Sequence, residues 1–308
     1  MSEYLIEAEH LSKMYRDAFA VYDVSFKIKK GEIVGLVGKN GAGKSTLIRI
    51  LTGISIATNG DFYLFGDHEP KNLSSHLKEV TAIIEAPALI EKMSGKDNLK
   101  YACLMKGMKD FIKSGYIKEK MDFVGLGNLY ESDKAVSKYS LGMRQRLSIA
   151  IALIGEPKIM VLDEPTNGLD PEGIKDIRDL LTRINRENQV TMIISSHILS
   201  ELEKFATSYL FIEKGRLVGS ISASDMENSS GKSMSIITND NQKALKLLKD
   251  NSFVTTEIEN MIKITNIANP TDILNLIYAQ GFTLSYLKEE ENSLEDYYLK
   301  VTGGLRND

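Results

Sequence analysis

A glycine-rich segment near the N-terminus has residues suited to holding phosphate groups. It reads G-x-x-x-x-G-K-S over residues 38–45, follows the apolar run 33–37 and precedes a helix-like pattern. Glycines let successive backbone N–H groups approach phosphate oxygens, and the dipole of the following helix adds positive potential. In such a motif Lys44 reaches the β- and γ-phosphates, and the hydroxyl of Ser45 is a ligand for Mg²⁺. The segment predicts a nucleoside triphosphate site; the alternative is a glycine-rich turn before a helix.

Two later apolar runs end in residues that could act on a bound triphosphate. The run 159–162 reads as a buried strand and leads into Asp163 and Glu164. An aspartate at the end of such a strand can hold Mg²⁺, directly or through water, while the glutamate can polarise an attacking water. The strand-like run 190–196 leads into His197, which is placed to meet the γ-phosphate. A histidine taken alone is more often structural.

A third segment, Y-S-L-G-M-R-Q-R at 139–146, indicates the start of a helix. Ser140 is a plausible N-cap, and the helix should run to about Gly155, before Pro157. A capped helix start that exposes serine and glycine is an anion site. The alternative is a core helix that is merely well capped.

The elements that position these residues follow a recognisable order. A β-rich stretch covers residues 3–37, and residues 95–155 are mainly helical in pattern. Strands and helices alternate again from 158 to 219, as expected of a parallel sheet with a nucleotide at the carboxyl ends of its strands. The helical part would carry Ser140 away from the phosphate loop of its own chain.

Length and composition limit the class of protein. The 308 residues correspond to about two domains at roughly 150 residues each. With 43% hydrophobic and 26% charged residues, the chain is no disordered, collagen-like or disulfide-based protein. A single cysteine, Cys103, fits a reducing compartment. No run approaches the ~20 apolar residues of a membrane span, and the charged first residues do not match a secretory signal. The formal charge of −4 argues against nucleic acid as a partner.

The C-terminal part differs from the rest in charge and pattern. Residues 220–308 contain 8 Lys or Arg and 13 Asp or Glu, so this part carries the negative charge of the chain. The serine-rich segment 220–232 predicts a linker. Residues 233–308 show a strand and helix order of β-α-β-β-α-β, which is ferredoxin-like, and a final helix at 293–301. We expect a docking or regulatory module without catalytic residues.

Taken in order and spacing, these segments resemble the nucleotide-binding subunit of an ATP-binding cassette (ABC) transporter over residues 1–219. The resemblance implies that 38–46 is the Walker A loop, 159–164 is Walker B, 140–143 falls on the signature motif and 167–170 is the D-loop. It also implies that Glu164 is the catalytic carboxylate, with His197 and Lys44 beside it. The nucleotide-binding residues that it implies are Tyr15, which would stack on adenine, Gly38, Asn40, Gly41, Gly43, Lys44, Ser45, Thr46, Ser140 and Gly142.

The same resemblance implies an α/β fold with a P-loop NTPase cassette. Such a cassette has a RecA-like core, an antiparallel β subdomain and a helical subdomain, here at about 87–155. We expect the cassette to cover residues 1–219, followed by the linker 220–232 and a small α+β accessory domain at 233–308.

Two departures from the usual motifs carry further information. The signature has Leu141 where the family usually has glycine, and Met143 where it usually has glutamine. Glu85 stands where most relatives have the glutamine of the Q-loop. It keeps an oxygen for Mg²⁺ but adds a negative charge, so the expected metal ligands are Ser45, Asp163 and Glu85. The alternative is that Glu85 is a solvated loop residue. The I-I-E-A-P pattern around it resembles the ABC ATPases of lantibiotic immunity and bacitracin-type peptide resistance.

The function implied is an ATPase that uses ATP and Mg²⁺ to power a membrane exporter of antimicrobial peptides or drugs. Its partners would be transmembrane permease subunits and a second nucleotide-binding subunit, identical or not, at the cytoplasmic face of the membrane. In such a dimer Ser140 and Gly142 of one subunit meet the ATP held by Lys44 of the other.

Other functions are less consistent with the sequence. An alternative is a soluble ABC ATPase acting on nucleic acid or the ribosome. Such proteins usually have two cassettes or a long coiled coil between the Walker motifs, and this chain has neither. A GTPase would need an N-K-x-D motif. An importer shares the cassette motifs, so only the Glu85 loop and the C-terminal part favour export.

Overall fold

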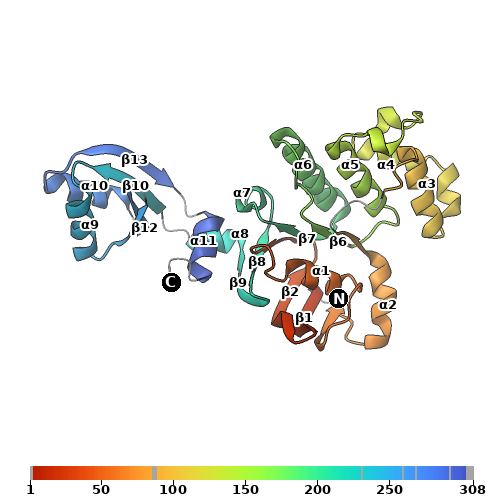
Figure 1. Cartoon of the computed structure of the whole chain (residues 1–308), viewed down its shortest axis with the longest axis horizontal. Coiled ribbons are helices and arrows are strands. Elements are labelled where there is room, and N and C mark those ends of the chain that lie inside the picture. The colour runs from red at the N-terminus through yellow and green to blue at the C-terminus, as the bar shows by residue number, and fades with distance from the viewer. Residues whose placement is uncertain are drawn as a thin grey trace. The chain divides into compact units, whose positions relative to one another are not determined.

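The computed structural model describes residues 3–84, 89–229, 232–258, 260–267, 269–290 and 293–302. The chain forms two compact units, residues 1–220 and 221–308, which are described separately here (Figure 1). Among the described residues, no helix is both long enough and apolar enough to cross a membrane.

A six-stranded sheet forms the centre of the first unit, in the order β5-β6-β7-β3-β8-β9. Each pair of neighbours from β5 to β8 is parallel, so these strands end at one edge. Every residue of β3, β6 and β7 is buried, as expected where both faces of a parallel sheet are covered. The strands are β3 (Ile33–Val37), β5 (Val80–Ile83), β6 (Ile159–Asp163), β7 (Thr191–Ser196), β8 (Ser208–Glu213) and β9 (Arg216–Ser222).

The register of this sheet aligns the residues that follow its central strands. Asp163 of β6 pairs with Ser195 of β7, and Ser196 pairs with Val37 of β3. The loop after β3, the residues after β6 and the residues after β7 therefore start side by side at the carboxyl edge of the sheet.

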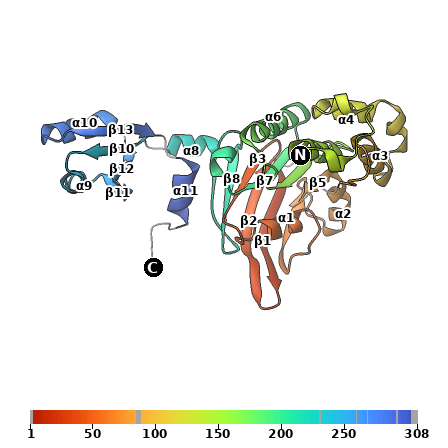
Figure 2. The ribbon, with the colours of Figure 1, turned by 45° about the horizontal axis from the view of Figure 1, so that its top comes forward.

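An antiparallel sheet, in the order β2-β1-β4, packs with the phosphate-loop helix α1 (Lys44–Leu51). Its strands are β1 (Tyr4–Tyr15), β2 (Ala18–Lys29) and β4 (Asn59–Leu64), and β1 and β2 form the long hairpin visible in Figure 2. Leu11, Val24 and Ile48 are fully buried in the shared core. This core fixes the start of α1 against the hairpin.

The remaining α-helices of the first unit are α2 (Leu73–His76), α3 (Gly95–Met105), α4 (Tyr116–Phe123), α5 (Leu141–Ala152), α6 (Pro171–Asn188) and α7 (Leu199–Leu202). Of these, α3, α4 and α5 form the helical part of the unit, and the long helix α6 follows the D-loop. Polar N-caps explain where three of them begin: Ser94 accepts from Asp97 N, Ser140 from Met143 N, and Asp170 from Gly173 N. The N-cap predicted at Ser140 is thus confirmed.

The second unit has the strand and helix order that the sequence predicts. Its sheet runs β11-β12-β10-β13 with each pair antiparallel, which is the split β-α-β arrangement of ferredoxin-like folds. Met234, Ile264 and Leu248 lie in one apolar core between this sheet and its helices. The elements are β10 (Lys232–Thr238), α9 (Asn241–Asp250), β11 (Val254–Ile258), β12 (Met261–Ile267), α10 (Pro270–Ala279), β13 (Leu284–Glu290) and α11 (Leu294–Val301).

The segment 220–232, for which the composition predicts a linker, includes regular secondary structure. It contains the end of β9 and a short helix, α8 (Ala223–Ser229). Ser222 caps this helix, because its Oγ accepts from Asp225 N at 2.9 Å and donates to Asp225 Oδ2 at 2.7 Å. The S-x-x-D spacing is a capping box, a signal that the serine-rich composition conceals. That residues 1–219 and 233–308 are separate domains stays a proposal.

The final helix α11 is attached to the sheet of the second unit by a partly buried ion pair. Lys263 Nζ of β12 donates to Asp296 Oδ1 at 2.6 Å, and Ser293 N donates to Asp296 Oδ2 at 3.0 Å. Burial alone would raise the pKa of Asp296, but the hydrogen bonds from Lys263 and Ser293 outweigh it and hold that pKa below its usual value. Asp296 therefore stabilises the helix as a charged group.

We expect Asp296→Asn to loosen α11 without unfolding the sheet. Losing a charge-assisted hydrogen bond in a partly exposed pair costs about 1–2 kcal/mol. Hydrogen exchange should therefore speed up in α11 and stay unchanged in β10 and β12. The exposed neighbour Glu295, changed to Gln, is the matched control.

The same contact predicts a pH dependence. Because the folded pKa of Asp296 is lowered, its contribution is full above the ordinary carboxyl pKa and is lost as the pH falls through the lowered value. The exchange difference between wild type and Asp296→Asn should thus shrink in acid. An equal difference at every pH would contradict this role.

Candidate functional site

The three loops at the carboxyl edge of the central sheet enclose an open cavity of about 570 Å³. We call it the phosphate-loop cavity. The hairpin, the phosphate loop, α5 and the ends of β6 and β7 all contribute to it. Its lining residues are Ala20, Lys39, Asn40, Gly41, Gly43, Lys44, Ser45, Thr46, Leu141, Gln145, Asp163, Glu164, Asn167 and His197.

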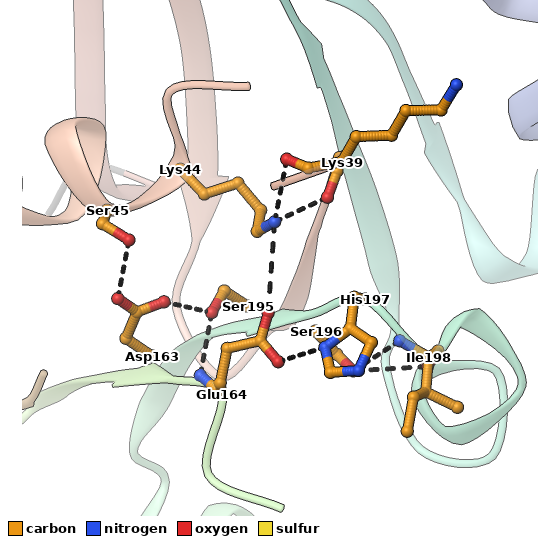
Figure 3. A network of polar contacts seen from close by, with 10 residues as sticks. Lys39, Lys44, Ser45, Asp163, Glu164, Ser195, Ser196, His197 and Ile198 are labelled. Carbon is orange, nitrogen blue, oxygen red and sulfur yellow. Dashed lines mark hydrogen bonds and ion pairs between the residues drawn. The ribbon is translucent and has the colours of Figure 1, made fainter. Parts of the chain in front are cut away.

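The carboxylate of Asp163 is a buried charged group at the base of the site. Ser45 Oγ donates to its Oδ2 at 2.9 Å, and Ser195 Oγ donates to its Oδ1 at 2.5 Å (Figure 3). Asp163 is 6% exposed and Ser195 is fully buried. A buried charge is tolerated only with hydrogen-bond partners, and here each carboxylate oxygen has one.

Glu164 lies between a histidine and a lysine. Its Oε2 is hydrogen-bonded to His197 Nδ1, and its Oε1 is 4.0 Å from Lys44 Nζ. The backbone of Glu164 has a φ of 53°, in the left-handed region, and its N–H donates to Ser195 Oγ at 2.9 Å. Figure 3 shows the side chain pointing from the end of β6 toward both partners. The site therefore presents a carboxylate with one imidazole and one ammonium beside it.

Lys44 is held by its own loop. Its Nζ donates to the carbonyl of Gly38 at 2.5 Å and to that of Lys39 at 3.3 Å. Burial lowers the pKa of Lys44, while the negative charges of Glu164 and Asp163 oppose that change. The ammonium is thus largely desolvated, a state in which it attracts phosphate more strongly than an exposed lysine would.

Two glycines of the loop are required by space and backbone conformation. Gly43 has a φ of 109°, and a Cβ there would lie 2.5 Å from the carbonyl oxygen of Ala20. A Cβ on Gly38 would collide with the carbonyl of Ile212. The loop can therefore pass between the hairpin and β8 only with glycine at these positions.

The donors at the base of the cavity suit Mg²⁺. Ser45 and Asp163 bring a hydroxyl and a carboxylate to within 2.9 Å of each other, and hard oxygen ligands of this kind are what Mg²⁺ prefers. In the described part of the chain, no group of three or more His, Cys, Asp or Glu could hold a metal ion. A bound metal would hence need oxygens from phosphate or water as well.

Ser140 and Gly142 lie outside the phosphate-loop cavity. They line a second cavity of about 520 Å³, here the signature cavity. Its walls come from the signature segment 140–143, the D-loop and the first turn of α6. One chain therefore has the two sets of predicted phosphate contacts in different cavities.

Besides Ser140 and Gly142, two residues expected to bind nucleotide, Gly38 and Tyr15, do not line the phosphate-loop cavity. The hairpin residue that lines this cavity is Ala20. Tyr15 is 47% exposed, and its ring lies 5.2 Å from Lys13 Nζ. The stacking of Tyr15 on adenine stays a prediction. Glu85, predicted as a metal ligand, lies outside the described residues.

The sequence analysis misses Ser195, which connects the two acidic residues. Its hydroxyl donates to the carboxylate of Asp163 and accepts from the backbone of Glu164. The available signal is a pair of serines, 195 and 196, that directly follow the apolar residues 192–194 in a fully buried strand. A fully buried hydroxyl needs a partner, so such a serine points to a polar neighbour.

Comparison with known proteins identifies the family. The family model described as ABC transporter matches residues 21–167. The bacitracin transport ATP-binding protein BcrA of Enterococcus faecalis is 35% identical over 305 residues, which cover 98% of this chain and 97% of that protein. The lantibiotic transport ATP-binding protein SrtF of Streptococcus pyogenes is 39% identical over 214 residues, 70% of this chain and 89% of that protein.

A solved structure supports the same assignment. The chain cbiO1 of Clostridium perfringens, part of the ABC transporter complex cbiONQ, superposes with a TM-score of 0.66 and 25% identity. The match covers 80% of this chain and 96% of that one. With a phosphate loop, a hydroxyl-bound aspartate and a glutamate–histidine pair at one sheet edge, this chain belongs to the ATP-binding proteins of ABC transporters and is an ATPase.

Proposed function

We propose that this ATPase powers the export of antimicrobial peptides through separate transmembrane subunits, at the cytoplasmic face of the membrane. The observation that carries the proposal is the match to a bacitracin transport protein over 98% of the chain, together with the match to a lantibiotic transport protein. These relatives give no support to the alternative of an ATPase acting on nucleic acid.

In the proposed reaction the side chains at the sheet edge have distinct tasks. Glu164 orients or deprotonates the attacking water, because its carboxylate lines the cavity and has a histidine beside it. Lys44 and His197 stabilise negative charge on the transferred phosphoryl group. Mg²⁺, when bound with the nucleotide, would neutralise charge on the phosphates, and Ser45 and Asp163 are the described residues that would hold it.

We further propose that two such chains, or this chain and a related one, meet head to tail. Ser140 and Gly142 of one subunit would then contact the ATP in the phosphate-loop cavity of the other. The separation of the two sets of residues into different cavities supports this arrangement. The hydroxyl of Ser140 and the exposed N-terminus of α5 offer donors for a phosphate.

Ser195 would be a positioning residue in this mechanism. It holds Asp163 through a carboxylate oxygen and Glu164 through the backbone N–H. The water-activating carboxylate and the metal-binding carboxylate are therefore fixed relative to each other by one buried hydroxyl.

We predict that Ser195→Ala lowers kcat by about 10- to 100-fold, since a buried hydrogen bond to a charged group contributes about 1.5–3 kcal/mol. Steady-state ATPase assays measure the effect. The matched control is Ser196→Ala, because among the described residues the hydrogen bonds of the Ser196 hydroxyl go to the backbone of Ile198. Equal losses in both variants would mean a general weakening of β7, and no loss in Ser195→Ala would contradict the positioning role.

We predict that Glu164→Gln binds ATP but hydrolyses it at least about 100-fold more slowly, the usual contribution of a positioned acid–base group. The closed dimer should then accumulate in ATP, which size-exclusion chromatography with light scattering detects. Lys44→Ala is the comparison, since it should neither bind ATP tightly nor dimerise. A Glu164→Gln protein that turns over at wild-type speed would refute the assignment.

We also propose that Glu85 contacts the metal ion and couples ATP hydrolysis to the transmembrane subunits, as the Q-loop glutamine does in most relatives. Removing its charge in Glu85→Gln, or its oxygens as well in Glu85→Ala, should raise the Mg²⁺ concentration needed for half-maximal ATPase, more so in the alanine variant. Peptide tolerance of cells should fall in parallel. Wild-type values of both quantities in both variants would exclude the role.

The transport proposal itself is tested in cells that express this chain together with the transmembrane subunits that co-purify with it. We expect higher tolerance to bacitracin-type or lantibiotic peptides, and loss of that tolerance with Glu164→Gln at equal expression. Tolerance that is the same with and without the active ATPase would reject the substrate class while leaving the ATPase activity intact.

A further inference from the structure

Leu141 is placed between the two cavities. Among the described residues that line them, it is the one residue that belongs to both, and its side chain is 46% exposed. A leucine here has no counterpart in the usual signature motif, which has glycine at this position. Its side chain therefore makes contacts that a glycine could not make.

Leu141 is in contact with the D-loop. The position where a Cβ of Gly168 would stand is 3.2 Å from Leu141 Cδ2, so the leucine lies directly on the backbone of Gly168. In return, Leu169 Cδ2 lies 3.8 Å from the corresponding position on Gly142. Each segment thus places a leucine over a glycine of the other.

The D-loop connects this packing to the catalytic carboxylate. Asn167 N donates to the carbonyl of Glu164 at 3.1 Å, and Leu169 N donates to that of Thr166 at 3.2 Å. Gly168 has a φ of 78°, so the turn depends on a left-handed residue without a side chain. The path from Glu164 to Leu141 is a short hydrogen-bonded turn that ends in the leucine contact.

Leu141 directly follows Ser140, the serine of the signature segment. Ser140 Oγ accepts from Met143 N at 3.2 Å, and Leu141 is the first residue of α5. A shift of the D-loop would therefore push on the first turn of α5, where the phosphate contact of Ser140 is expected. The contact joins groups that serve two different nucleotides in the proposed dimer.

We propose that Leu141 is a positioning residue that couples the phosphate-loop cavity of a subunit to the signature cavity which the same subunit presents to its partner. This inference rests on the proposed head-to-tail dimer. The state of Glu164 and Asn167 at one nucleotide sets the orientation of Ser140 at the other, because the leucine transmits displacement of Gly168 to the start of α5. Coupling of this kind appears as cooperativity in ATP.

The first test needs neither nucleotide nor partner. Leu141→Ala removes the contact but keeps a strong helix former at the start of α5. In hydrogen exchange of the isolated chain we expect residues 167–169 to exchange about four- to fifteenfold faster, the factor for losing one or two buried methylenes. Leu141→Met, which keeps an apolar chain of similar volume, should restore the wild-type rate.

A matched control separates this effect from the general cost of removing a leucine. Leu104 of α3 is 47% exposed and lines neither cavity. Leu104→Ala should leave the exchange of 167–169 unchanged. Unchanged exchange in Leu141→Ala, or equal acceleration in both alanine variants, would overturn the inference.

The second test uses the ATPase activity. Leu141→Ala should lower kcat several-fold and bring the Hill coefficient for ATP toward 1. If the wild-type enzyme and the Leu141→Ala variant are equally cooperative, the coupling through Leu141 is refuted and the proposed function still stands. A wild-type chain without dimerisation or cooperativity would refute the coupling together with the dimer, even if the exchange result showed the contact.

Discussion

A carboxylate that is 6% exposed has lost most of its hydration, and it stays charged only where donors and a cation replace the water. At Asp163 the donors are Ser45 and Ser195, and Lys44 adds a desolvated ammonium nearby. These groups come from the loop after β3 and the ends of β6 and β7. The aligned ends of the parallel strands are therefore a requirement for the buried charge, and the site cannot form without that register.

Glu164 shows how the same arrangement serves catalysis. A non-glycine residue in the left-handed region costs of order 1 kcal/mol or more, and such conformations persist where surrounding contacts hold them. Ser195 holds the backbone of Glu164, and His197 holds the carboxylate. The side chain is thereby aimed at the phosphate-loop cavity instead of following the strand direction. The hydrogen bonds of Glu164 with Ser195 and His197 therefore both maintain its left-handed backbone conformation and orient its carboxylate.

The separation of the signature segment from the phosphate loop makes a single chain incomplete in the proposed mechanism. The helical part places Ser140 on a different cavity, and both the D-loop and the start of α5 contribute residues to the two cavities. The second unit has its own sheet and core, and its strands carry none of the residues of either cavity. The match to a bacitracin transport protein covers 98% of this chain and therefore includes the second unit.

By itself the sequence determined the features that depend on neighbouring residues: the phosphate loop, the buried strands, the cap at Ser140 and the ferredoxin-like order of the second unit. These follow from short-range rules of backbone conformation, capping and apolar periodicity. It did not reveal the hydroxyl of Ser195 between two acidic residues, the helix capped by Ser222, or the contact of Leu141 with Gly168. Only the tertiary structure decided the contacts of Ser195 and Leu141, because each joins residues about 30 positions apart whose meeting depends on strand register and helix packing.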